Sequence, residues 1–222
     1  MKLRTKLIIL GSILGVLWLG FFAFLALIYV PDWYEPVYVN PADQQKLRDD
    51  FTSLTTRFNN GMQHPQPFDL TVSARDINRY LSGMGFLDPR LKNSIPGGVT
   101  DPAVQLEDGY LKMGAVVDHE GKRVFASLWL KVTAQEEWLV LDDVRAKIGL
   151  YPVPRDLLKK QLEKASGKLF RSFPMVEEIL DHGQYPNRFR YPNGNYDCRV
   201  THLRAIDGVV YLTIQPIPRP NK

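Results

Sequence analysis

The side chains that could carry out chemistry are few and are scattered along the chain. There is one cysteine, Cys198, and no Cys-His-Asn arrangement can be picked out around it. A buried structural thiol and a catalytic nucleophile are the two interpretations of Cys198, and the sequence favours the buried thiol. The segment Ser82-Gly-Met-Gly85 lacks the preceding glycine of a nucleophile elbow. We therefore expect no nucleophilic catalysis.

Metal, acid–base and phosphate sites are no better indicated. The adjacent carboxylates Asp142 and Asp143 point to opposite faces of a predicted strand, so they do not form a general acid–base pair by themselves. The glycine-rich Ile95-Pro-Gly-Gly98 has no Lys-Ser/Thr partner of a phosphate loop. The histidines have no metal-ligand spacing: His64, His119, His182 and His202. We predict a protein that is not an enzyme and has no catalytic residue, metal or cofactor.

The longest informative pattern lies at the N-terminus. The 24 residues from Leu7 to Val30 are uncharged and would make a helix of about 36 Å, enough to cross a hydrocarbon core of about 30 Å. A cleaved signal peptide is the alternative, since Ala23-Phe-Leu-Ala26 offers a small-x-small site, but the apolar run is longer than the usual ~7–15 residues. We therefore predict a cytoplasmic stub and single-pass anchor over residues 1–30 in the cell (inner) membrane, with the C-terminal domain extracytoplasmic.

The charge distribution argues against a nucleic-acid partner. The formal net charge is +4, with 28 Lys and Arg against 24 Asp and Glu. Three of the basic residues precede Asp32 and no acidic residue does, so the rest of the chain is close to neutral. A single cysteine allows no internal disulfide, and the predicted domain must rest on its hydrophobic core, for which it is long enough.

The remaining residues are organised as a linker over 31–41, an α+β domain over 42–216 and a loose tail over 217–222. The pattern predicts an amphipathic helix over 42–58, which packs on the domain or on the bilayer surface, and a strand over 68–72 that leads into a helix capped by Ser73. Gly83 and Gly85 are expected to end that helix, and residues 82–102 to form a long loop.

From residue 103 the hydrophobic period changes to two. The alternation predicts strands over 103–106, 110–117, 122–134 and 138–148, and a C-terminal hairpin of 198–206 and 209–214 around Asp207-Gly208. Between them the spacing predicts helices over 155–171 and 174–181. The predicted fold is α+β: an N-terminal transmembrane helix, then a curved antiparallel sheet wrapped around a long amphipathic helix.

The order of these motifs resembles a known family. The resemblance depends on these segments: Leu70–Leu81, Val104–Met113, the pair of long strands, Ile148-Gly149-x-x-Pro-Val-Pro154 before the long helix, and the closing hairpin from Val200 to Leu212. Together they resemble the YpmS-like bacterial membrane-anchored proteins, which have a TULIP-like half. The resemblance implies a curved sheet around a helix and an apolar groove for lipid. Residues 82–102 and 182–197 match nothing in that family.

The predicted site is an apolar groove between the sheet and the long helix. Its candidate lining is apolar on both elements: Met113, Leu128, Leu130, Leu139, Leu141, Leu158, Leu162 and Leu169. Leu139 and Leu141 alternate with Trp138 and Val140, so the sequence leaves open which row faces inward. A filled core with the same pattern is the alternative to an open groove. Three lysines of the long helix are candidate headgroup contacts, the alternative being a solvated helix face: Lys159, Lys160 and Lys164.

Two functions remain after these exclusions. The first is a membrane-anchored extracytoplasmic lipid-binding or lipid-handling module of the cell envelope, with membrane lipids as its partners. The second is a non-catalytic interaction or scaffold subunit of an envelope complex, with another membrane protein as its partner.

Overall fold

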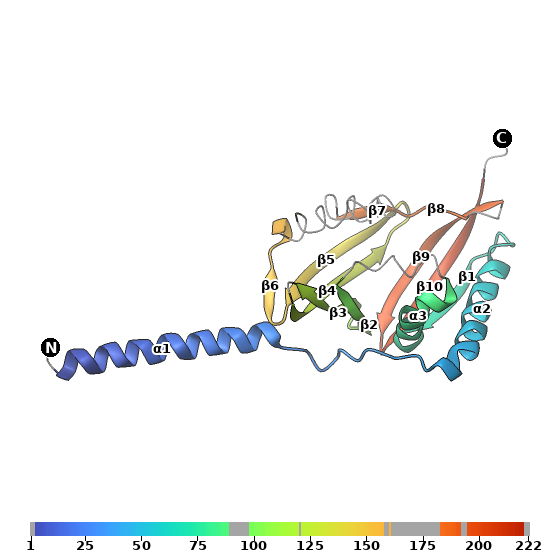
Figure 1. Ribbon diagram of the computed structural model, residues 1–222. Coiled ribbons are helices and arrows are strands. Elements are labelled where there is room, and N and C mark those ends of the chain that lie inside the picture. Colours follow the sequence, from blue (N-terminus) through green and yellow to red (C-terminus); the bar gives the residue numbers. More distant parts are fainter. Residues whose placement is uncertain are drawn as a thin grey trace.

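The computed structural model describes residues 3–88, 98–119, 121–157, 160, 183–191 and 195–219, with side chains from residue 14 onward except that of residue 119. Three α-helices have defined bounds in this part of the chain: α1 (Leu3–Ile28), α2 (Gln44–Gly61) and α3 (Ala74–Leu87). Helix α1 projects away from the rest of the molecule, whereas α2 and α3 lie together at the opposite end of the domain (Figure 1). Residues 155–157 are helical and follow a short strand at residues 151–153.

One antiparallel sheet is built from consecutive strands of the middle of the chain. Its strand order is β2-β3-β4-β5-β6, and β7 pairs with a different part of β5. The strands are β2 (Val99–Glu107), β3 (Tyr110–His119), β4 (Lys122–Ala134), β5 (Trp138–Ile148), β6 (Tyr151–Val153) and β7 (Gln184–Pro186). The two long strands begin and end where the period-two pattern predicts.

A second antiparallel sheet combines a strand from the N-terminal part of the domain with strands from its C-terminal part. Its strand order is β1-β10-β9-β8. Its strands are β1 (Phe68–Ser73), β8 (Phe189–Arg190), β9 (Tyr196–Ile206) and β10 (Val209–Pro218). The β9–β10 turn is the predicted one: Asp207 and Gly208 both have positive φ, as a two-residue hairpin turn requires. Strand β10 runs beyond the expected end at Ile214 to Pro218, and Pro216 is fully buried.

The hydrophobic core lies where α3 packs between the two sheets. Ser73 caps α3 as predicted, because its side chain accepts a hydrogen bond from the Asp76 N–H. The core cluster joins Ala74 of α3, Val104 and Leu106 of β2, and Ala205 of β9. The partly buried residues packed against it come from α3, β3 and β10: Ile77, Leu81, Leu111, Met113 and Val210.

Helix α3 does not stop at its glycines, so the predicted loop over 82–102 is wrong at both ends. The helix continues through Gly83 and Gly85 to Leu87, and β2 already begins at Val99. The reason for Gly83 is packing: a Cβ there would collide with the side chain of Leu47, which is fully buried between α2 and α3. Glycine in this helix marks a close approach rather than an end.

The predicted fold class is corrected by this architecture. The fold is mostly antiparallel strand in two sheets, and a single sheet wrapped around a long helix is not found, because β1 pairs with the C-terminal strand β10 instead of joining β2–β5. The helices predicted over 155–171 and 174–181 lie outside the described residues except for residues 155–157 and 160. The predicted transmembrane helix is not found either: within the described part of the chain, no helix is both long and apolar enough to cross a membrane.

Candidate functional site

The predicted groove residues of the sheet all lie on one face. Met113 of β3 pairs with Leu128 of β4, and Leu130 lies two residues further along the same strand. The open question about Leu139 and Leu141 is answered by the register, in which Leu141 is opposite Val132 and Leu139 is opposite Ala134. The sheet residues that we proposed as groove lining therefore form one apolar surface.

A β-bulge at Asp142 produces this alignment. Lys131 pairs with Asp143 but the next residue, Val132, pairs with Leu141, so Asp142 is an extra residue in β5. One inserted residue shifts the alternation, so Leu141 before the bulge and Val144 after it share a face. The Asp142 carboxylate accepts a hydrogen bond from the Thr133 hydroxyl on β4.

This apolar surface is only partly covered. Met113 contacts the core cluster beneath α3, whereas Leu128, Leu130, Leu139 and Leu141 are half-buried and lie outside that cluster. Fully buried residues of β2, by contrast, sit at the α3 end of the same sheet. The candidate site is thus the part of the sheet face on β4 and β5 that lies beyond α3.

The helix side of the predicted groove lies outside the described residues, except for Lys160. Leu158, Leu162 and Leu169, together with Lys159 and Lys164, lie outside the described residues. Lys160 is described, is helical and is exposed. The predicted headgroup contacts of this helix therefore remain predictions.

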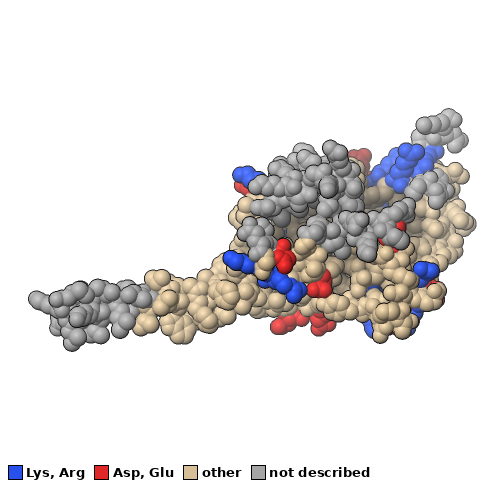
Figure 2. Space-filling model, viewed as in Figure 1, with Lys and Arg blue, Asp and Glu red and all other residues tan. Residues whose placement is uncertain are grey.

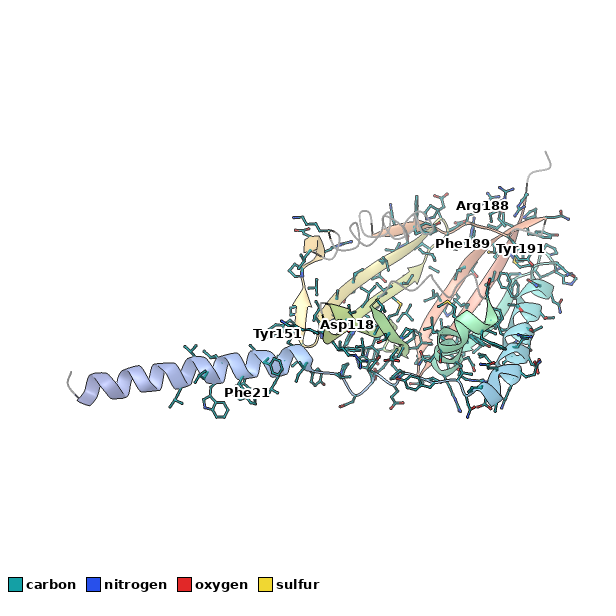
Figure 3. All side chains as sticks on the ribbon, in the orientation of Figure 1. Phe21, Asp118, Tyr151, Arg188, Phe189 and Tyr191 are labelled. Atoms are coloured by element: carbon teal, nitrogen blue, oxygen red, sulfur yellow. The ribbon has the colours of Figure 1, made fainter. Side chains whose placement is uncertain are left out.

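The base of α1 is fixed to the β5–β6 turn. The Leu150 N–H donates to the Ala26 carbonyl at 2.8 Å, and the Tyr151 hydroxyl donates to the Ala23 carbonyl at 3.0 Å (Figure 3). The Ala26 carbonyl is one of the last four in α1, which have no partner within the helix, so the Leu150 N–H satisfies it. Gly149 has a φ of +57° and a Cβ there would collide with the Ala26 and Leu27 carbonyls, so only glycine fits this contact. No sequence pattern indicated this role of Gly149.

The linker after α1 packs on the other face of the six-stranded sheet. The Trp33 ring lies 5.9 Å from Phe125 and 6.5 Å from Trp129, edge to face. The Tyr34 hydroxyl donates to the Asp101 carbonyl at 2.6 Å. Burial, together with the nearby charge of Asp101, raises the pKa of Tyr34 to about 12.

The same face carries a cluster of aromatic and basic side chains. Lys112 and Lys147 each place Nζ 4.6 Å from the centre of the Trp129 ring. Lys112 is only 8% exposed and pairs with Glu107 at 2.5 Å. Next to them, the hydrogen bond from Arg145, followed by that from the Tyr110 hydroxyl, lowers the pKa of Asp143. Sequence analysis missed this cluster, although the alternation of basic and aromatic residues on β3–β5 was a usable signal.

Cys198 is half-buried and its thiol lies 3.6 Å from the Phe189 carbonyl. Burial is the main reason that the pKa of this thiol is raised, which leaves it less reactive than a free cysteine at neutral pH. Among the described residues, no group of three or more His, Cys, Asp or Glu side chains is placed to hold a metal ion.

Comparison with known proteins supplies no further assignment: no family model, no curated protein and no solved structure matches this chain.

Proposed function

We propose that this protein is a membrane-associated module that binds lipid, with α1 holding it to a bilayer and the apolar face of β4 and β5 holding an acyl chain. The observation that carries the proposal is the alignment of Leu128, Leu130, Leu139 and Leu141 on one half-buried sheet face. It is supported by the surface of α1.

From Leu14 onward, helix α1 exposes apolar side chains on every side. Four consecutive residues, Val16, Leu17, Trp18 and Leu19, are 69%, 64%, 59% and 72% exposed. Successive residues are about 100° apart around a helix, so these four cover its whole circumference. Figure 2 shows no charged side chain on the described part of α1, which projects away from the domain. An exposed apolar surface of this extent is typical of an interaction site, and it supports contact between α1 and lipid at a membrane.

The sheet face supplies a site for an acyl chain rather than a polar ligand. Between the strands of this face, the direct neighbours are aliphatic: Leu130 pairs with Val144, and Leu128 pairs with Ala146. Each methylene that moves from water to such a surface contributes about 0.8 kcal/mol. An acyl chain laid over several of these residues is therefore bound by several kcal/mol without any hydrogen bond.

The test uses two variants of adjacent residues that point to opposite faces of β5. Leu141→Asn places an amide on the apolar face, and Val140→Asn is the matched control because Val140 pairs with Thr133 on the other face. The full chain, extracted in mild detergent, is examined by native mass spectrometry for retained lipid and by displacement of cis-parinaric acid.

We expect the wild type and Val140→Asn to retain lipid and Leu141→Asn to lose affinity by about tenfold or more, as for the loss of one buried leucine. The proposal is contradicted if the wild-type chain carries no lipid and does not bind cis-parinaric acid. Co-purification of a stoichiometric membrane protein in place of lipid would favour the scaffold role instead.

A further inference from the structure

Two contacts attach the N-terminal part of the chain to the domain. The first is at the base of α1, where the Leu150 N–H donates to the Ala26 carbonyl at 2.8 Å. The second is made by residues 29–40, which we call the strap and which run along the six-stranded sheet from α1 towards α2 (Figure 1). At the far end of the strap, the Val39 N–H donates to the Ser82 hydroxyl of α3 at 3.2 Å. The strap therefore connects the α1 margin of the domain with its helical end.

Aromatic side chains hold the strap on the sheet. The Trp33 ring lies 5.9 Å from the Phe125 ring, and the Tyr34 ring lies 4.6 Å from it. Gly114 of β3 makes this approach possible, because a Cβ at that position would lie 2.8 Å from the Trp33 ring and 2.7 Å from the Phe125 ring. This part of the sheet is thus shaped to receive the strap.

Asp101 of β2 binds the strap from an unusual backbone conformation. It lies at the bulge where the register of β2 and β3 shifts, and its φ is +54°. Among the described residues, the other non-glycine positions with positive φ are Asp108 and Asp207, which lie in two-residue hairpin turns that require it. A strained residue inside a strand persists where surrounding contacts hold it. The Tyr34 hydroxyl makes such a contact, because it donates to the Asp101 carbonyl at 2.6 Å.

Phe125 of β4 links the strap to the base of α1. Its side chain is 2% exposed, and its ring contacts both aromatic rings of the strap. Its carbonyl accepts a hydrogen bond from the Gly149 N–H at 2.8 Å. Gly149 in turn lies against the Ala26 and Leu27 carbonyls of α1, where a Cβ would not fit. One chain of packed and hydrogen-bonded neighbours therefore connects the two contacts.

We propose that the strap is a latch for α1: the strap and the base of α1 bind the six-stranded sheet together and leave it together, while the core beneath α3 stays folded. Only residues 27–32, six in all, separate Ala26 from Trp33. Such a short connection keeps each contact at high effective concentration when the other is formed. The direction of α1 thus depends on the strap as well as on the β5–β6 turn, whatever ligand the domain binds.

The first experiment weakens the strap and follows the base of α1. Trp33→Ala is the test variant, and Trp18→Ala is the matched control because the Trp18 ring is 59% exposed and contacts only rings of its own helix among the described residues. Hydrogen exchange is followed by NMR in the full chain, purified in mild detergent. The Leu150 amide reports the base of α1, and the Val104 amide, which donates to the Asn78 side chain at 2.6 Å, reports the core.

We expect the Leu150 amide to exchange about tenfold faster or more in Trp33→Ala, as for the loss of an aromatic contact, and to be unchanged in Trp18→Ala. The Val104 amide should keep its protection in both variants. Unchanged exchange at Leu150 in Trp33→Ala would show two independent contacts and overturn the latch. Equal acceleration at Val104 would also overturn it, because the strap would then leave the sheet only when the whole domain unfolds.

The second experiment runs in the opposite direction and leaves the strap sequence intact. Gly149→Ala weakens the base of α1, and Gly121→Ala, where a Cβ meets nothing within 4 Å, is its control. The chain is labelled with 5-fluorotryptophan, and Trp33→Phe assigns the ¹⁹F signal of Trp33. Because coupling between two contacts is reciprocal, we expect the Trp33 signal to move towards its position in the unfolded chain in Gly149→Ala but not in Gly121→Ala. A Trp33 signal that stays at its wild-type position in Gly149→Ala would contradict the latch.

Discussion

The side-chain amide of Asn187 replaces a missing strand neighbour for Val200. Its Oδ1 accepts from the Val200 N–H at 2.9 Å, and its Nδ2 donates to the Val200 carbonyl at 2.7 Å and to the Gln135 carbonyl at 2.6 Å. Val200 belongs to β9 of the four-stranded sheet, and Gln135 to the β4–β5 turn of the other. Asn187, which is 1% exposed, therefore joins the two sheets through buried hydrogen bonds.

We predict that Asn187→Asp strongly destabilises the domain. The variant keeps the size of the side chain but loses the donor, and it sets a carboxylate against two carbonyl oxygens that are then unsatisfied. Each unsatisfied buried group costs about 1–3 kcal/mol, so we expect a loss of at least about 2–4 kcal/mol in the free energy of unfolding. Urea denaturation measures the change. Asn195→Asp, at an exposed position, is the control and should be within about 0.5 kcal/mol of wild type; equal stabilities of the two variants would contradict the structural role of Asn187.

Gly149→Ala should detach α1 from the domain. The added Cβ collides with the Ala26 and Leu27 carbonyls in addition to the strain of a positive φ. Gly121→Ala is the matched control, since its φ is +77° and nothing lies within 4 Å of a Cβ there. That control isolates the backbone strain, which is about 1–2 kcal/mol.

The readout is hydrogen exchange at the Leu150 amide, which bonds the Ala26 carbonyl. We expect this amide to exchange slowly in the wild type and in Gly121→Ala, and to lose its protection in Gly149→Ala. Retained protection in Gly149→Ala would show that α1 is not held by this contact.

Tyr34 should make the domain lose stability in alkali. Its pKa is about 12 in the folded state against an ordinary value of 10, so the folded state keeps a proton that the unfolded state releases. The contribution is complete below pH 10 and is lost as pH rises through 12. The free energy of unfolding should therefore fall more steeply with pH for wild type than for Tyr34→Phe. The difference in slope corresponds to the release of up to one proton on unfolding. Tyr211→Phe, at an exposed position, should follow wild type; a Tyr34→Phe slope equal to that of wild type would refute the burial argument.

The sequence by itself determined several of the individual elements. Strands β4 and β5 follow from period-two alternation, the β9–β10 turn from Asp207-Gly208, and the start of α3 from Ser73. These features are local, because a turn or a cap depends on residues only a few positions apart. The alternation of apolar residues along the strands is also a local feature, so it could indicate the candidate lining of the groove.

Only the tertiary structure decided how the elements combine. Pairing of β1 with β10 brings residues 68–73 against residues 209–214, and no local pattern specifies a partner so distant in sequence. The bulge at Asp142 decided the face of Leu139 and Leu141, because one extra residue reverses the alternation that the sequence displays. Buried amides such as Asn78, which bonds both backbone groups of Val104, are invisible to hydrophobic patterning because their partners come from other elements. The edge of β5 likewise takes its form from the tertiary structure, because the short strands β6 and β7 pair with different parts of it.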